Sequence, residues 1–163
     1  MQIKLFTPFD KGSPFDKERI VNFLYEHLQQ YGDPKKDILK AVDYALKDKV
    51  SHGGFIVCGL EDDEIIGAVV VNRTGMEGYI PENILVYIAV HEKTRGKGYG
   101  KQLMHKAIEV AEGDIALHVE PDNPARYLYE KIGFTSKYLE MRYKKSDASA
   151  SAQDQSEEVA ESR

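Results

Sequence analysis

Residues 84–100 of this chain read Ile84-Leu85-Val86-Tyr87-Ile88-Ala89-Val90-His91-Glu92-Lys93-Thr94-Arg95-Gly96-Lys97-Gly98-Tyr99-Gly100, and Lys101-Gln102-Leu103-Met104 follow. The apolar, β-branched first half is typical of a strand, and the glycine-rich turn after it leads into a helix. The N–H groups at the start of a helix have no carbonyl partners, and the helix dipole adds partial positive charge there. The stretch therefore predicts a site for a phosphorylated ligand.

Three commoner nucleotide-binding or RNA-binding motifs do not fit this turn. A P-loop requires a Gly-Lys-Ser/Thr triplet, whereas Gly100-Lys101 is followed by Gln102. The dinucleotide fingerprint G-x-G-x-x-G needs a third glycine where Leu103 stands. Residues 97–100 copy the first half of an RNA-binding strand motif, but residues 101–104 lack the alternating aromatic and apolar side chains that complete it.

The turn does match the pattern Arg/Gln-x-x-Gly-x-Gly/Ala, with Arg95, Gly98 and Gly100 at the fixed positions. This pattern resembles motif A of the GCN5-related N-acetyltransferase (GNAT) family, in which the loop cradles the pyrophosphate of coenzyme A. Residues 123–134, Asn-Pro-Ala-Arg-Tyr-Leu-Tyr-Glu-Lys-Ile-Gly-Phe, resemble motif B of the same family, where an Asn opens a short helix and Gly-Phe starts the next strand. The resemblance covers roughly residues 54–143 and implies acetyl-CoA as cosubstrate.

The composition indicates a single domain with a substantial core. The chain has 163 residues, and 42% of them are hydrophobic. We expect neither a membrane span nor a signal peptide, because long apolar runs are missing, including from residues 1–8. Cys58 is the single cysteine, which excludes an internal disulfide and favours a cytoplasmic location. It lies in an apolar run, so we expect a core residue rather than a nucleophile.

The formal net charge of −5 is concentrated at the C-terminal end. Residues 146–163 carry five carboxylates and one arginine, which leaves a net charge of only −1 for residues 1–145. This segment has a single large apolar residue, Val159, and cannot offset its ordering entropy by burial. We therefore expect one N-acetyltransferase domain over residues 1–145 and a disordered acidic tail over 146–163. The body lacks the basic excess of a general nucleic-acid binder.

The hydrophobic periodicity predicts the element order β-α-α-β-β-β-α-β-α-β(-β). Strands are expected at residues 2–6, 55–60, 65–71, 83–90, 115–119 and 134–144, the last as one strand or a pair. Helices are expected at residues 16–31, 34–47, 101–112 and 124–131. The third helix has Leu103, Met104, Ala107, Ile108 and Ala111 on one apolar face. The fold class is α/β (α+β), with a mixed, mostly antiparallel sheet and helices on both faces, as the GNAT resemblance also implies.

The resemblance implies that main-chain groups make most of the contacts that bind the coenzyme. It implies that the strand ending Ile88-Ala89-Val90 diverges from the strand at 115–119, pairs with the pantetheine arm and donates one N–H to the thioester carbonyl. The cationic side chains around the turn, including Lys93, would neutralise the phosphates. Asn123 is expected to cap its helix and to contact the coenzyme. The predicted cofactor-binding residues are Ile88, Ala89, Val90, Arg95, Gly96, Lys97, Gly98, Tyr99, Gly100, Lys101, Asn123 and Tyr129.

Acetyl transfer to an amine needs an acid for the leaving thiolate and a base for the ammonium proton. Tyr129 occupies the motif B position where the family commonly carries an acid tyrosine, and the alternative is a tyrosine that only packs on the sheet. His118, near the end of the strand at 115–119, is either a base or an inert strand histidine. Glu82 is the rival base, and Tyr87 is a candidate for positioning the amine. The spacing of the histidines predicts no metal site.

We interpret the chain as an acetyl-CoA-dependent N-acetyltransferase that transfers the acetyl group directly to a primary amine of a small molecule or protein. The alternatives are a non-catalytic acyl-CoA-binding module of the same fold, or a nucleotide- or RNA-binding domain. Loops 29–33 and 73–82 are expected to shape the acceptor site. Residues 134–145 are short for the β-hairpin that often closes the family fold, so that side is either open or completed by a second subunit, and dimers are common in the family. Neither nucleic acid nor membrane is expected as a partner.

Overall fold

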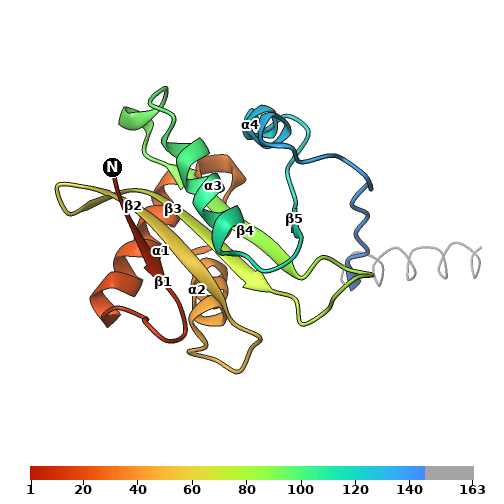
Figure 1. Cartoon of the computed structure of the whole chain (residues 1–163), viewed down its shortest axis with the longest axis horizontal. Coiled ribbons are helices and arrows are strands. Elements are labelled where there is room, and N and C mark those ends of the chain that lie inside the picture. Colours follow the sequence, from red (N-terminus) through yellow and green to blue (C-terminus); the bar gives the residue numbers. More distant parts are fainter. Residues whose placement is uncertain (146–163) are drawn as a thin grey trace, which may run out of the picture.

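One five-stranded sheet runs through the molecule, and its strands follow one another in chain order. The computed structural model describes residues 1–145, so the predicted acidic tail at 146–163 lies outside the described residues. The strands are β1 (Gln2–Phe6), β2 (Gly54–Glu61), β3 (Glu64–Arg73), β4 (Asn83–Val90) and β5 (Ile115–Leu117). The first four pair antiparallel, and β5 runs parallel to β4 (Figure 1). The predicted mixed, mostly antiparallel sheet is confirmed.

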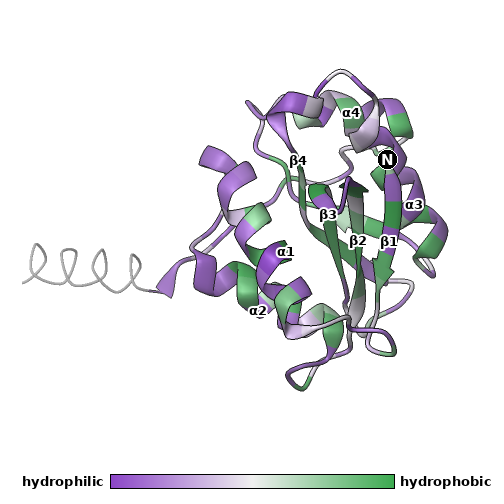
Figure 2. Ribbon diagram, turned by 90° about the vertical axis from the view of Figure 1, so that its left-hand side faces the viewer, coloured by the Kyte–Doolittle hydropathy of each residue, from purple (hydrophilic) through white to green (hydrophobic). Residues whose placement is uncertain are grey.

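Helices cover both faces of this sheet, as the sequence predicted. They are α1 (Pro14–His27), α2 (Lys35–Leu46), α3 (Tyr99–Val110) and α4 (Ala125–Ile132), with short 3-10 turns η1 (Gln29–Tyr31) and η2 (Glu92–Thr94). Figure 2 shows α1 and α2 on one side of the sheet and α3 on the other. Two apolar clusters result: one joins α1 and α2 to the sheet, and the other joins α3 and α4 to its opposite face.

The first helix begins and ends at residues that satisfy its free backbone groups. Ser13 accepts a hydrogen bond from the Asp16 N–H, and the Asp16 carboxylate accepts one from the Ser13 N–H, which is a capping box. Pro14 occupies the first turn, so the helix starts two residues before the predicted position 16. It ends at His27, and the predicted last turn becomes η1 instead.

The centre of the sheet is apolar on both faces. Six consecutive residues of β2 and seven of β3 are buried, which explains why these strands read as continuous apolar runs rather than alternating ones. The connecting turn places Asp62 and Asp63 at φ of 49° and 63°, a pair of left-handed residues that suits a tight antiparallel hairpin.

The strand predicted at residues 134–144 is wrong, because the structure has no strand after α4 among residues 1–145. The physical reason is the lack of a pairing surface: β5, the edge strand, is three residues long instead of the predicted five. The large apolar side chains of this segment are consequently exposed, with Leu139 at 88% and Met141 at 90%. A period-two pattern identifies a strand only if a neighbouring strand is available.

Helix α3 packs on the sheet through a narrower face than the sequence predicted. Leu103, Met104 and Ala107 are fully buried, and a Cβ built on Gly67 would lie 2.5 Å from Leu103 Cδ1, so the helix approaches β3 closely there. Ile108, predicted on the same face, is instead 40% exposed. No helix among the described residues has the length and apolar character needed to cross a bilayer.

The difference between Leu103 and Ile108 gives a test of this packing. Leu103→Ala should lower the free energy of unfolding by about 2–5 kcal/mol, because it leaves a cavity against β3. Ile108→Ala, on the same helix, should lower it by less than about 1 kcal/mol. Urea unfolding followed by circular dichroism measures both, and equal losses would show that α3 does not sit on the sheet in this orientation.

Candidate active site

The outer edge of β4 loses its strand partner halfway along its length. Pairing with β5 covers only three residue pairs, from Asn83 with Ile115 to Leu85 with Leu117. At the same point the register with β3 shifts, because Val70 faces Tyr87 and Val71 faces Leu85, which leaves Val86 as a β-bulge. Beyond the bulge, no described strand pairs with the β5-facing edge of β4. Main-chain donors and acceptors of the segment up to Val90 are therefore available to an extended ligand.

The turn after β4 has the geometry of an anion site. Gly96 and Gly98 lie at φ of 82° and 78°, in the left-handed region that side chains rarely adopt. Gly98 is the N-cap of α3, and no side chain caps this helix. The first N–H groups of α3, starting at Tyr99, therefore lack intrahelical acceptors and point out of the helix end.

Four cations surround this turn, and none of them has a carboxylate partner among residues 1–145. They are Lys93, Arg95, Lys97 and Lys101, and all four are exposed. Lys97 places its Nζ 5.9 Å from the centre of the Tyr99 ring. Unpaired cations next to free N–H groups form a surface suited to a phosphate or diphosphate.

Helix α4 carries the candidate acid and begins at Ala125, one residue after the predicted start, with Pro124 rather than Asn123 at the N-cap position. The Asn123 side chain nevertheless accepts a hydrogen bond of 2.9 Å from the Ala125 N–H and so satisfies the first free N–H group of the helix. The Tyr129 side chain is buried, with 7% of its surface exposed, and the centre of its ring lies 6.1 Å from the centre of the Phe134 ring. Its hydroxyl has no hydrogen-bond partner among residues 1–145. Burial raises the pKa of Tyr129 to about 12. Tyr127, two residues earlier, is 68% exposed and faces away.

The two candidate bases lie at different places on the sheet. His118 follows the last residue of β5 and is exposed. Its neighbours Leu117 and Val119 are partly buried and pack against the cluster below α3 and α4. Glu82 instead precedes β4, and its Oε1 accepts a hydrogen bond of 3.5 Å from the Asp114 N–H. This is the end of β4 opposite to the glycine turn, so the structure does not bring Glu82 to the other site residues.

The connection between α1 and α2 packs against the site in a way that the sequence did not reveal. Gln29 donates to Glu92 at 2.6 Å, and the Tyr31 hydroxyl donates to the Asp122 carbonyl at 3.3 Å. Tyr87, on β4, donates to the Asp33 carboxylate at 2.5 Å. Burial and this carboxylate raise the pKa of the Tyr87 phenol. Residues 29–33 were predicted to shape the acceptor side, but no local signal identifies their partners.

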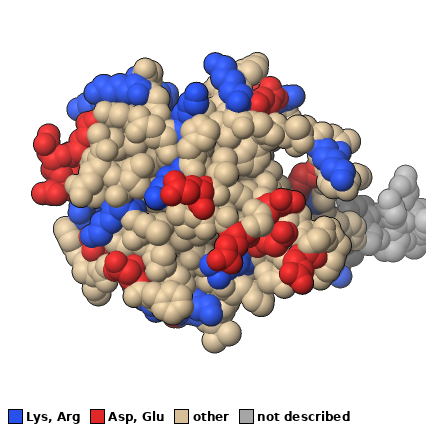
Figure 3. All heavy atoms as spheres, in the orientation of Figure 1, with Lys and Arg blue, Asp and Glu red and all other residues tan. Residues whose placement is uncertain are grey.

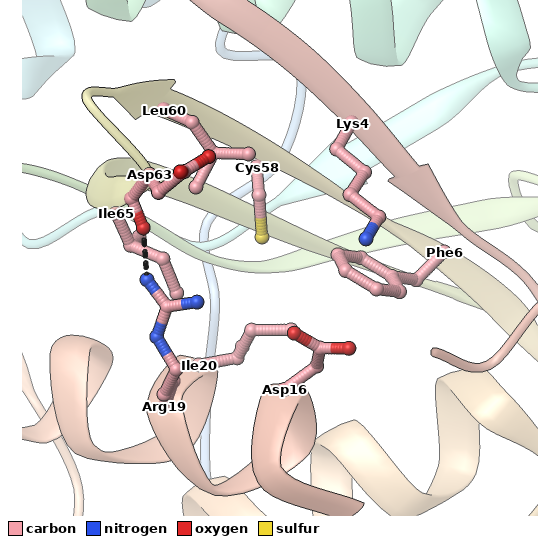
Figure 4. Close-up of a pocket in the computed structure, with 9 residues that line it drawn as sticks. All are labelled: Lys4, Phe6, Asp16, Arg19, Ile20, Cys58, Leu60, Asp63 and Ile65. Atoms are coloured by element: carbon pink, nitrogen blue, oxygen red, sulfur yellow. Dashed lines mark hydrogen bonds between the residues drawn. The ribbon is translucent and has the colours of Figure 1, made fainter. Parts of the chain in front are cut away.

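Cys58 lies outside this site, as predicted. It lines a pocket on the α1 side of the sheet, together with Lys4, Phe6, Asp16, Arg19, Ile20, Leu60, Asp63 and Ile65 (Figure 4). Cys58 is 1% exposed, and desolvation raises the pKa of its thiol to about 12. It is a core thiol, not an activated nucleophile. No group of three or more His, Cys, Asp or Glu within residues 1–145 is arranged to hold a metal ion.

Comparison with known proteins relates this arrangement to one family. The model of the acetyltransferase (GNAT) family matches residues 20–134. The [ribosomal protein bS18]-alanine N-acetyltransferase of Haemophilus influenzae is 33% identical over 88 residues, which cover 52% of this chain and 57% of that protein. The chain thus matches little more than half of the length of this curated relative.

Solved structures share the whole fold at lower identity. A ribosomal-protein-alanine N-acetyltransferase from Brucella melitensis biovar Abortus superposes with a TM-score of 0.60 at 19% identity, covering 88% of this chain and 98% of its own. An aminoglycoside N-acetyltransferase in complex with CoA gives a TM-score of 0.62 at 17% identity, covering 88% and 95%. These likenesses show that the fold is that of the acetyltransferases.

The raised pKa of Tyr129 predicts a specific loss of stability in alkali. Between pH 10 and pH 12 the unfolded chain releases this proton while the folded protein keeps it, so the stabilisation is complete below pH 10 and declines as the pH rises. By pH 11 this one group should lower the free energy of unfolding by about 1 kcal/mol. Denaturant titrations at pH 9 and pH 11 should show a loss that is about 1 kcal/mol larger in wild type and in Tyr127→Phe than in Tyr129→Phe, in which the buried Cys58 thiol and Tyr87 phenol still contribute. A decline of equal size in all three proteins would contradict it.

Proposed function

The chain belongs to the acetyltransferase (GNAT) family, and we propose that it transfers the acetyl group of acetyl-CoA directly to a primary amine. One observation carries the proposal: β4 parts from β5 after Leu85 and then runs straight into the turn with left-handed Gly96 and Gly98. An unpaired strand edge that leads to an anion site matches an elongated ligand with a polar arm and a diphosphate.

Main-chain groups hold the acetyl donor in this proposal. The edge of β4 at Ile88, Ala89 and Val90 pairs with the amide groups of the pantetheine arm, as an added strand would. One N–H near the bulge at Val86 donates to the thioester carbonyl oxygen, where negative charge develops during the reaction. The side chains of Ile88 and Val90 pack in the core at the same time, because side chain and backbone serve different purposes.

The glycine turn binds the diphosphate. The N–H groups at Gly96, Gly98 and Gly100 and at the start of α3 donate to the phosphate oxygens, and the exposed cations balance the charge. Left-handed glycines allow the backbone to approach an anion without a Cβ in the way, and nothing lies within 4 Å of a Cβ built on Gly98. Asn123 contacts the coenzyme from the opposite side through groups that its cap leaves free.

Tyr129 and His118 move the protons. The amine nitrogen attacks the thioester carbon after His118 accepts a proton from the ammonium group, directly or through water. The carbon–sulfur bond breaks, and the leaving thiolate takes the phenolic proton of Tyr129. The attacking nitrogen gives up its second proton as the amide forms, and this proton restores the phenol. A phenol is protonated at neutral pH already at its ordinary pKa of about 10, as an acid must be, and the raised pKa of Tyr129 leaves that state unchanged. The position of Glu82 at the far end of β4 favours His118 as the base.

The acceptor class is a primary amine of a small molecule or protein. The curated relative acts on the alanine of a ribosomal protein, and a structural neighbour is an aminoglycoside N-acetyltransferase, so both kinds of amine occur among similar proteins. Residues 29–33 border the acceptor on the α1–α2 side, where Asp33 and Tyr87 form a polar pair. The single reduced Cys58 suits the cytoplasm.

A homodimer is the proposed assembly. Residues 138–143 expose Tyr138, Leu139, Met141 and Tyr143, each by more than three quarters of its surface. The outer edge of β5 carries no strand among the described residues. A second copy that covers these side chains would remove apolar surface from water and complete the acceptor side.

Two other functions receive less support. A binding module that holds acyl-CoA without catalysis has no need for a buried phenol beside the site. A nucleic-acid-binding domain would need a continuous basic surface, whereas Figure 3 shows Lys and Arg interspersed with Asp and Glu on the face in view.

Ligand-induced stabilisation tests the cosubstrate. Acetyl-CoA should raise the melting temperature in a concentration-dependent manner, whereas ATP, NAD and oligonucleotides should not. Gly98→Ala should abolish most of that rise. Gly78→Ala is the matched control, because Gly78 also has a positive φ, of 74°, and open space around its Cβ, but lies in the distant β3–β4 connection. No shift in the wild-type protein would refute the proposal.

Turnover tests the acid and the base. Tyr129→Phe and His118→Gln should each lower kcat at least about 10²-fold while the affinity for acetyl-CoA changes little, because each group acts on a proton in the reaction. Tyr127→Phe replaces an exposed tyrosine of the same helix, His105→Gln replaces an exposed histidine of α3, and both variants should keep wild-type turnover. Thiol release with a panel of amines measures these rates. Wild-type kcat in Tyr129→Phe would remove that residue from the mechanism.

A further inference from the structure

The β2–β3 hairpin holds the glycine turn at both ends. At the start of the turn, the His91 N–H donates to the carbonyl of Ile66 on β3 at 2.8 Å. At its end, the Tyr99 hydroxyl donates to the carboxylate of Glu61, the last residue of β2. The two ends of the turn are thus attached to one hairpin, whose strand β3 also pairs with β4.

The hairpin is well placed to act as a fixed support. Its strands are the most extensively buried ones in the sheet, and its turn is closed by left-handed Asp62 and Asp63. On the side away from the glycine turn, the guanidinium of Arg19 on α1 donates to the Asp63 carbonyl, as the dashed line in Figure 4 shows. Glu61 itself lies across from Glu64 in the hairpin register.

The glycine turn has few restraints of its own near Gly98. Its internal backbone hydrogen bonds end with the one from Lys97 N–H to the Thr94 carbonyl, at 3.4 Å. Nothing lies within 4 Å of a Cβ built on Gly96 or on Gly98. A glycine-rich segment without packing loses much conformational entropy when it is ordered. A contact that fixes its far end therefore lowers the cost of binding a ligand there.

We propose that Glu61 is a positioning residue for the phosphate turn, and that it acts by holding Tyr99 so that the N–H groups of Gly98 and the first turn of α3 face the coenzyme before it binds. The inference rests on the proposed function for the identity of the ligand. It assigns a role in cosubstrate affinity to a carboxylate that lies 38 residues away from its partner in the chain.

The charge of Glu61 and its proposed positioning role predict opposite changes in CoA affinity when the side chain is removed. A carboxylate beside a diphosphate site repels the ligand, so its removal should tighten binding if only charge matters. If Glu61 positions the turn, its removal should weaken binding despite the lost repulsion. Glu61→Gln separates the two effects, because an amide oxygen still accepts the hydrogen bond from Tyr99 but carries no charge.

The experiment compares four variants of the full chain by calorimetric titration with CoA and by hydrogen exchange of the free protein. Glu61→Ala and Tyr99→Phe should each raise the Kd for CoA by about tenfold, whereas Glu61→Gln should stay within about twofold of wild type. Glu64→Ala, which removes a carboxylate from the same hairpin without touching Tyr99, should also stay within about twofold. In steady-state kinetics, the loss in Glu61→Ala should fall on the KM for acetyl-CoA rather than on kcat.

Hydrogen exchange decides the proposal independently of the ligand. In Glu61→Ala and Tyr99→Phe, but not in Glu64→Ala, the amides of Lys97 and Gln102, which donate to the carbonyls of Thr94 and Gly98, should exchange faster than in wild type, while those of β2 should not. Unchanged exchange, or tighter CoA binding by Glu61→Ala, would overturn the inference. A wild-type protein that does not bind CoA would instead overturn the proposed function, and faster exchange would still show that Glu61 holds the turn.

Discussion

The site depends on the early separation of two parallel strands. β4 and β5 pair over three residues only, and the bulge at Val86 turns β4 away just where that pairing ends. A longer β5 would saturate the outer edge of β4 and leave no main-chain groups for a ligand. The same separation leaves β5 too short to support a following strand, which explains why residues 134–144 stay unpaired. The proposed binding edge and the exposed C-terminal segment therefore have one structural cause.

The features that sequence reasoning identified are those that local chemistry determines. The glycine turn requires left-handed backbone at Gly96 and Gly98, and few residues other than glycine permit that. Asn123 before Pro124 starts a helix wherever it occurs in such a context. The order of strands and helices could be predicted for the same reason, because the hydrophobic periodicity of each segment and its capping residues are local properties.

The features that sequence reasoning missed depend on distant parts of the chain. Ile108 has the right spacing for the buried face of α3 but is 40% exposed, because the part of that face that meets the sheet depends on strands distant in the chain. The contacts of Tyr99 with Glu61 and of Tyr87 with Asp33 join residues 38 and 54 positions apart, and no periodicity encodes them. Glu82 was a candidate base because it comes directly before β4. The glycine turn follows the last residue of that strand, so the full length of β4 separates Glu82 from the turn.

The burial of Cys58 has a practical consequence for enzymology. The chain has one sulfhydryl group, and in the folded protein it is shielded from solvent and fully protonated at neutral pH. Chromogenic disulfide reagents react with thiolates, so the native protein contributes almost no background signal when they are used to detect the CoA that the proposed reaction releases. The same group becomes reactive once the chain opens, so one reagent reports both product formation in the active sample and the fraction of molecules that have denatured.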